Sequence, residues 1–140
     1  MITAPDTNVL VSLWNEDDSL NLPTKAAMRA ALDRGSLLIA APVFSELLAS
    51  PSKDEPFLDE FLATTGISVD WNLNETIWRI AGRAFHAHAV RRRRQREPGP
   101  RRILADFLIG AHALRNGFPL LTLDSRFYRA AFPRLPIVTI

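Results

Sequence analysis

Short apolar runs alternate along the chain with longer stretches whose apolar residues recur at helical intervals. The apolar runs predict strands over residues 1–4, 37–41, 67–71, 119–123 and 137–140. Helical spacing predicts helices over residues 9–14, 23–34, 43–49, 57–63, 72–94, 104–115 and 126–132. This alternation predicts an α/β fold with a mainly parallel central sheet of about five strands and helices on both faces.

Residues with strong positional preferences mark the ends of several predicted helices. Asp6 stands in front of the first helix as a capping side chain, and Pro42 suits a first helical turn. Gly35 suits the left-handed turn after a helix. The spacing of Asn72 and Glu75 resembles a capping box, which predicts that the longest helix starts at residue 72.

The length of 140 residues is that of one domain, so we expect a single domain over residues 1–140. Hydrophobic residues make up 47% and charged residues 23% of the chain, as in a folded globular protein. The absence of cysteine excludes disulfides, thiolate nucleophiles and cysteine-ligated zinc. No apolar run approaches the roughly 20 residues that span a bilayer. Residues 1–20 carry no basic side chain and so lack the positively charged start of a secretory signal. We therefore expect a cytoplasmic protein that does not associate with a membrane.

Charge is divided unevenly along the sequence. Residues 1–75 contain 12 acidic and 4 basic side chains, whereas residues 76–140 contain 13 basic and 3 acidic ones. Residues 79–102 hold nine arginines against the single acid Glu97, and residues 97–100 predict an exposed loop within this block. Such a concentration of positive charge predicts an anionic partner, with nucleic acid first among the candidates.

Four acidic residues stand within apolar sequence, at least three of them near the carboxyl end of a predicted strand: Asp6, Glu46, Asp106 and Asp124. Each aspartate has an alternative role as a helix cap or turn residue. The carboxyl ends of parallel strands meet at one edge of the sheet, so we expect the four side chains to converge.

Convergence of carboxylates has an electrostatic consequence. Two like charges about 4 Å apart repel by about 4 kcal/mol at an effective dielectric constant near 20, so such a group takes up protons or binds a cation. An oxygen-only donor set without cysteine suits magnesium or manganese better than zinc. Ions of this kind activate water and neutralise charge on a phosphoryl group, which predicts hydrolysis of a nucleic-acid backbone.

Four segments that contain these acids, residues 5–10, 45–48, 106–113 and 121–128, resemble the successive motifs of PIN-domain ribonucleases. The resemblance is strongest to VapC-type toxins of toxin–antitoxin modules, and it covers essentially the whole chain. It implies a PIN-like α/β domain with magnesium-dependent endoribonuclease activity. It also implies an RNA substrate, a cognate VapB-type antitoxin and a homodimer.

The resemblance further implies roles for individual residues. Asp6 and Asp106 match the primary metal ligands, Glu46 a ligand or water-mediated partner, and Asp124 a ligand of a second ion or an outer anchor. The matching polar positions imply supporting roles for Thr7, Asn8 and Thr122. Gly110, one turn after Asp106, fits either close approach of metal or substrate or simple helix packing.

The arginines that flank the acids are expected to bind RNA: Arg91, Arg92, Arg93, Arg94, Arg96, Arg101 and Arg102. The alternative is a solvated helix end, where arginine is favourable in any case. The histidines His86, His88 and His112 are interpreted as structural or surface residues, since their spacing does not direct them to one site.

Two other functions remain open on the sequence. One is a noncatalytic RNA-binding or partner-binding module, in which the arginines act and the acids only cap helices. The other is a metal-dependent phosphohydrolase that acts on DNA or small phosphate esters.

Overall fold

The computed structural model describes residues 1–51, 53–95 and 102–140. The strands are β1 (Ile2–Pro5), β2 (Ser36–Ala40), β3 (Ser68–Asp70), β4 (Leu120–Thr122) and β5 (Ile137–Thr139). The helices are α1 (Thr7–Trp14), α2 (Asn21–Arg34), α3 (Ala41–Leu48), α4 (Glu55–Thr65), α5 (Glu75–Gln95), α6 (Leu104–Asn116) and α7 (Ser125–Ala131). Every predicted element is present, with ends shifted by a few residues. The predicted loop at residues 97–100 lies outside the described residues.

The five strands form one parallel sheet in the order β3-β2-β1-β4-β5. The predicted α/β architecture with a parallel five-stranded sheet is therefore confirmed. From β1 the chain first builds outward through β2 and β3, and then returns to place β4 on the other side of β1. The order thus reverses between β1 and β4, and in open parallel sheets ligands bind beyond the carboxyl ends of the strands at such a point.

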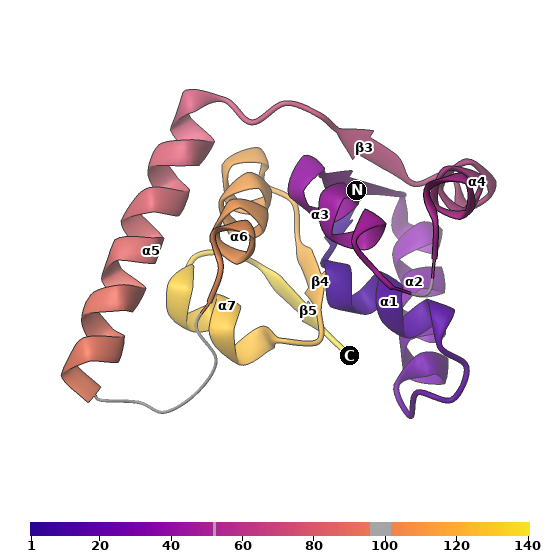
Figure 1. Ribbon diagram of the computed structural model, residues 1–140, viewed down its shortest axis with the longest axis horizontal. Helices are drawn as coiled ribbons and strands as arrows, with labels where there is room; N and C mark the ends of the chain where they lie inside the picture. Colours follow the sequence, from indigo (N-terminus) through magenta and orange to yellow (C-terminus); the bar gives the residue numbers. More distant parts are fainter. Residues whose placement is uncertain (52, 96–101) are drawn as a thin grey trace.

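Helices cover the sheet on two sides (Figure 1). The connection from β3 to β4 supplies the long helix α5 and the adjacent α6, and α7 lies with them. Helices α1, α2 and α4 lie on the opposite side of the sheet. The largest fully buried side chains, among them Phe107 of α6 and Tyr128 of α7, come from the strands and from the helix faces that meet them. The core thereby fixes the amino-terminal turns of α1, α6 and α7 relative to the sheet.

Gly35 ends α2, but not in the left-handed conformation predicted for it. Its φ is 162°, which is extended backbone, and a β-carbon at this position would overlap the backbone carbonyl of Met1. Glycine is required here because the start of β1 passes directly over the backbone.

The predicted start of the longest helix at Asn72 is also wrong. Helix α5 begins at Glu75, and Asn74 precedes it with its Oδ1 accepting a hydrogen bond of 3.0 Å from the backbone N–H of Ile77. Asn72 instead donates its backbone N–H to Asp70. The capping side chain therefore lies two residues later than the sequence pattern indicated, because the chain first completes a turn after β3.

The two explanations for Gly110 are separated by its neighbour. A β-carbon at Gly110 would overlap the ring of Phe132, which is itself buried. The geometry favours packing over close approach of a ligand, with Phe132 rather than the sheet as the neighbour.

Among the described helices, none is both long and apolar enough to cross a membrane.

Candidate active site

The four acids that the sequence analysis singled out lie at the carboxyl edge of the sheet. Asp6 directly follows β1 and Asp124 follows β4, and these neighbouring strands are joined there by a hydrogen bond of 2.8 Å from the Asp6 N–H to the Leu121 carbonyl. Glu46 lies on α3, which directly follows β2, and Asp106 lies in the first turn of α6. All four are therefore placed around the point where the strand order reverses.

Asp6 is the most buried of the four, with 5% of its surface exposed. Its Oδ1 accepts a hydrogen bond of 2.8 Å from the backbone N–H of Thr7, and its Oδ2 accepts one of 2.8 Å from the Thr122 hydroxyl. Burial raises the pKa of Asp6 to about 6, and the charges of Asp106 and Glu46 act in the same direction. The two hydrogen bonds only partly offset this rise, so the carboxylate lacks a full counter-charge.

Glu46 and Asp106 lie within the electrostatic range of each other and of Asp6. Burial raises the pKa of the Glu46 carboxyl, and the negative charge of Asp106 raises it further, against a lowering hydrogen bond of 2.6 Å from the Thr7 hydroxyl. Burial likewise raises the pKa of Asp106, and Asp124 adds to the rise. We call Asp6, Glu46, Asp106 and Asp124 the acid cluster, because each member interacts electrostatically with at least one other.

Of the polar residues predicted to support the acids, Thr7 and Thr122 contact them directly, and Asn8 contacts the backbone next to Asp124. The Thr7 hydroxyl donates to Glu46, and the Thr122 hydroxyl donates to Asp6 while it accepts a hydrogen bond of 3.0 Å from the Asp124 N–H. Asn8 Oδ1 accepts a hydrogen bond of 3.3 Å from the backbone N–H of Leu123. Thr122 therefore couples the carboxylate that follows β1 to the backbone that follows β4.

The donor chemistry of the acid cluster suits a hard divalent cation, since every donor atom is an oxygen. In the part of the chain that the structure describes, however, no group of three or more Asp, Glu or His side chains is arranged to hold a metal ion as it stands. Both oxygens of Asp6 accept hydrogen bonds from internal donors, and each of the other three acids has one oxygen engaged in this way. A carboxylate oxygen has two lone pairs, so the residues fit such an ion once their side chains turn toward a common centre.

Two residues near the acid cluster were missed at the sequence level. The Tyr128 hydroxyl is buried beside Asp6, and burial together with the negative charges of Asp6, Asp106 and Glu46 raises its pKa. It thus remains a protonated donor beside the acids. His88 packs against Phe107 and lies close enough for its charge to lower the pKa of Asp106. Only the tertiary structure shows that these two side chains lie beside the acids, although Tyr128 ends the segment 121–128 that contains Asp124.

His112 has the structural role that its spacing indicated. It is fully buried, and its Nε2–H donates a hydrogen bond of 2.9 Å to Asp70 Oδ2 at the carboxyl end of β3. This bond holds the pKa of Asp70 below its usual range. His112 therefore ties α6 to the edge of the sheet rather than contributing to the acid cluster.

The arginines divide into two groups. Arg91 and Arg92 are partly buried and Arg93 and Arg94 are exposed, all at the carboxyl end of α5. Arg102 instead precedes α6, and its Nη1 lies 2.6 Å from Asp124 Oδ2. The remaining two arginines expected to bind RNA, Arg96 and Arg101, fall outside the described residues.

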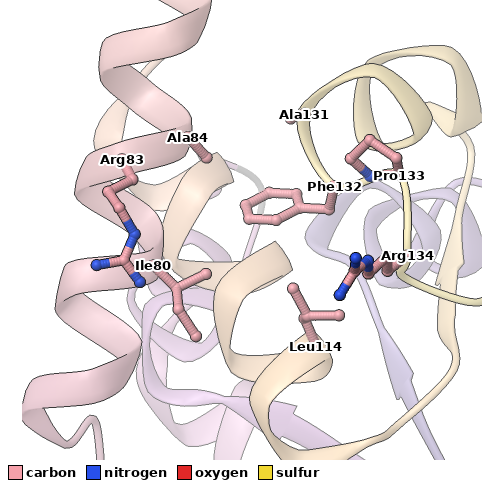
Figure 2. Close-up of a pocket in the computed structure, with 8 residues that line it drawn as sticks. All are labelled: Ile80, Arg83, Ala84, Leu114, Ala131, Phe132, Pro133 and Arg134. Atoms are coloured by element: carbon pink, nitrogen blue, oxygen red, sulfur yellow. The ribbon is translucent and has the colours of Figure 1, made fainter.

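An apolar cavity of about 360 Å³ lies elsewhere, between α5 and the segment that joins α7 to β5 (Figure 2). The Phe132 ring points into it from the α7 side, and Ile80 and Ala84 face it from α5. Among the described residues, the charged side chains that line it are Arg83 and Arg134. None of the four acids lines this cavity, so it is separate from the acid cluster.

Comparison with solved structures finds chains of similar fold. VapBC2 from Rickettsia felis, bound to a DNA fragment from their promoter, contains a chain 19% identical, with a TM-score of 0.65 over 99% of this chain and 98% of that one. A chain of VapBC-1 from nontypeable Haemophilus influenzae is 18% identical, with a TM-score of 0.66 over 99% of this chain and 98% of that one. A chain of FitAcB from Neisseria gonorrhoeae is 20% identical, with a TM-score of 0.66 over 99% of this chain and 97% of that one.

A search of curated proteins found no match. The profile of the family described as PIN domain matches residues 4–133, which include all four members of the acid cluster. The sequence motifs, the parallel sheet and the position of the acids at the point where the strand order reverses agree with this assignment. The chain therefore belongs to the PIN domain family.

Proposed function

We propose that this chain is a magnesium-dependent endoribonuclease and the toxin of a VapBC-type toxin–antitoxin system. The observation that carries the proposal is the acid cluster, four carboxylates drawn together at the carboxyl edge of the sheet. Membership of the PIN domain family supports nuclease activity, and the likeness to chains of VapBC and FitAcB structures supports the toxin assignment.

In this proposal Asp6 and Asp106 are the primary ligands of Mg²⁺, with Mn²⁺ as a substitute. Glu46 serves as a ligand or through water, and Asp124 as a ligand of a second ion or an outer anchor. When bound, such an ion lowers the pKa of water and neutralises charge that develops on the phosphoryl group. Thr122 and Thr7 orient Asp6 and Glu46 through the hydrogen bonds described above.

The arginines at the end of α5 supply positive charge that the acid cluster lacks. An acidic site repels phosphate, and Arg91 to Arg94 offset this repulsion by attracting the RNA backbone. The same proposal includes a VapB-type antitoxin as partner, a homodimer and a cytoplasmic location.

The test is cleavage of structured RNA with Mg²⁺, with EDTA, and by the Asp6→Asn variant with Mg²⁺. We expect cleavage by the wild type with Mg²⁺ only, and a loss of at least about 100-fold in Asp6→Asn because a buried ligand of the ion is removed. Asp59→Asn, which changes an exposed carboxylate of α4, is the matched control and should cleave like the wild type.

Three outcomes would contradict the proposal. Equal cleavage in all three conditions would show that the acids are not the active groups. RNA binding without cleavage would favour a noncatalytic binding module. Turnover of DNA or of small phosphate esters alone, offered in parallel, would identify a phosphohydrolase of another substrate class.

A further inference from the structure

Arg102 occupies a position unlike that of the arginines on α5. It precedes α6, and its Nη1 lies 2.6 Å from Asp124 Oδ2, with 31% and 30% of the two side chains exposed. An ion pair with this separation and partial burial is a defined contact rather than a loose surface attraction. Arg102 is therefore a part of the acid cluster's surroundings.

A second contact holds Arg102 in place independently of Asp124. The centre of its guanidinium lies 4.3 Å from the ring centre of Phe127, as in a cation–π interaction. Phe127 is itself 7% exposed, and the rings of Phe107 and Tyr128 contact it at centroid distances of 5.4 and 4.9 Å. The buried ring is thus a fixed platform that keeps the guanidinium beside the acids.

The positive charge of Arg102 reaches beyond Asp124. It acts on Asp106 as well, on which it opposes the effect of burial. A guanidinium is planar, remains charged, and matches a phosphate group with two parallel N–H donors. The central carbon of this group lies over Phe127, while its Nη1 pairs with Asp124.

We propose that Arg102 is a phosphate-binding residue of the active site, held by Asp124 in the metal-free chain and released to the RNA phosphodiester when Asp124 takes up a divalent cation. This inference rests on the proposed function. Its physical basis is competition, since two cations that share one carboxylate repel each other and the guanidinium already engages Asp124 Oδ2. Phe127 keeps the released guanidinium close to the place where the phosphate must lie.

The competition predicts opposite effects of one substitution. In Arg102→Ala, calorimetric titration with Mn²⁺ in the absence of RNA should show binding about two- to fivefold tighter, because Asp124 no longer has to leave its partner. In the same variant kcat for RNA cleavage with saturating Mg²⁺ should fall about tenfold or more, because a donor to the phosphate is lost. Arg102→Lys should have an intermediate kcat, since it keeps the charge without the planar donor pair.

Two controls accompany these variants. Arg79→Ala removes an arginine from an exposed ion pair with Glu75 on α5 and should change neither quantity. In an Asp124→Asn background, Arg102→Ala should tighten Mn²⁺ binding less, because the competing pair is already absent and only the effect of Arg102 on Asp106 remains.

Several results would overturn the inference. Weaker Mn²⁺ binding together with lower kcat in Arg102→Ala would indicate a structural role. A raised KM and flatter salt dependence at unchanged kcat would place Arg102 with the general RNA-binding arginines. Unchanged Mn²⁺ affinity in Arg102→Ala would show that Arg102 and the cation do not compete for Asp124.

Failure of the proposed function has a different signature. The wild type would then cleave no RNA with Mg²⁺, although Arg102→Ala still tightened Mn²⁺ binding. A wild type that bound no Mn²⁺ would contradict both proposals.

Discussion

Asp6 combines three demands in one residue: it follows the central strand β1, caps α1 and contributes a carboxylate to the acid cluster. Its carboxylate is buried, and the two hydrogen bonds that it accepts come from neutral donors. A buried charge without a counter-ion destabilises the fold, whereas the same charge favours uptake of a cation. The residue best placed to bind a metal is thus expected to cost the metal-free protein stability.

This cost is measurable through its dependence on pH. The folded-state pKa of Asp6 is about 6, above the usual 3.8, so the folded chain binds more protons than the unfolded chain between these values. The contribution of Asp6 to the free energy of unfolding therefore falls as pH rises through this window, by about 3 kcal/mol. The metal-free Asp6→Asn variant has no carboxyl to ionise at this position. Its free energy of unfolding should therefore rise progressively relative to that of the wild type from about pH 4 to about pH 6.

Urea denaturation in EDTA across that pH range checks the expectation. Asp59→Asn, with an exposed carboxylate on α4, should follow the wild type throughout. A stability difference between Asp6→Asn and the wild type that does not vary with pH would refute the prediction.

At the scale of elements, three helices present their amino-terminal ends to the acid cluster. Asp6 and Asp124 precede the first residues of α1 and α7, and Asp106 lies in the first turn of α6. The positive end of each helix dipole favours a carboxylate there, so the capping role and the candidate active-site role are compatible. The sequence posed these roles as alternatives, but the arrangement of the helices allows both at once.

Helix α5 ends in a run of four arginines. Replacement of Arg91, Arg92, Arg93 and Arg94 by alanine should weaken RNA binding and reduce the log–log slope of affinity against salt by up to about 3, because fewer counterions are released. Mn²⁺ affinity should change little, since Arg93 and Arg94 are exposed and solvent screens the effect of such charges on a site elsewhere. Binding titrations at several salt concentrations measure the slope.

A matched control is available on α2, where Lys25, Arg29 and Arg34 are also exposed. Their replacement by alanine should leave the salt slope for RNA nearly unchanged. An equal loss in both variants would mean that net charge alone, rather than the end of α5, attracts RNA.

At the scale of the whole molecule, binding of a metal to the acid cluster couples to folding. The unfolded chain separates the four carboxylates, so a cation that they share binds the folded state preferentially. Mg²⁺ at 100 times its dissociation constant should therefore stabilise the wild type by about 2.7 kcal/mol at neutral pH, and Asp6→Asn much less. Thermal melts with Mg²⁺ and with EDTA measure this difference, and equal stabilisation of both proteins would argue against a shared site.

Local patterns in the chain predicted most of the architecture. Each strand and helix was found from apolar periodicity, and Asp6 and Pro42 mark helix starts as expected. The helix start at Asn72 was wrong because of a local turn after β3, whereas the error at Gly35 came from a distant segment, since its conformation depends on the passage of Met1. Such contacts leave no trace in a local pattern.

The sequence by itself determined the fold class, the four acids and the excess of arginine, because periodicity, motif spacing and charge are properties of the linear chain. Tertiary structure alone decided that Arg102 contacts Asp124 and Phe127, and that the Tyr128 hydroxyl is buried beside Asp6. The reason is physical: pairing and burial depend on distances between segments, and these distances exist only after the sheet has brought β1 and β4 side by side.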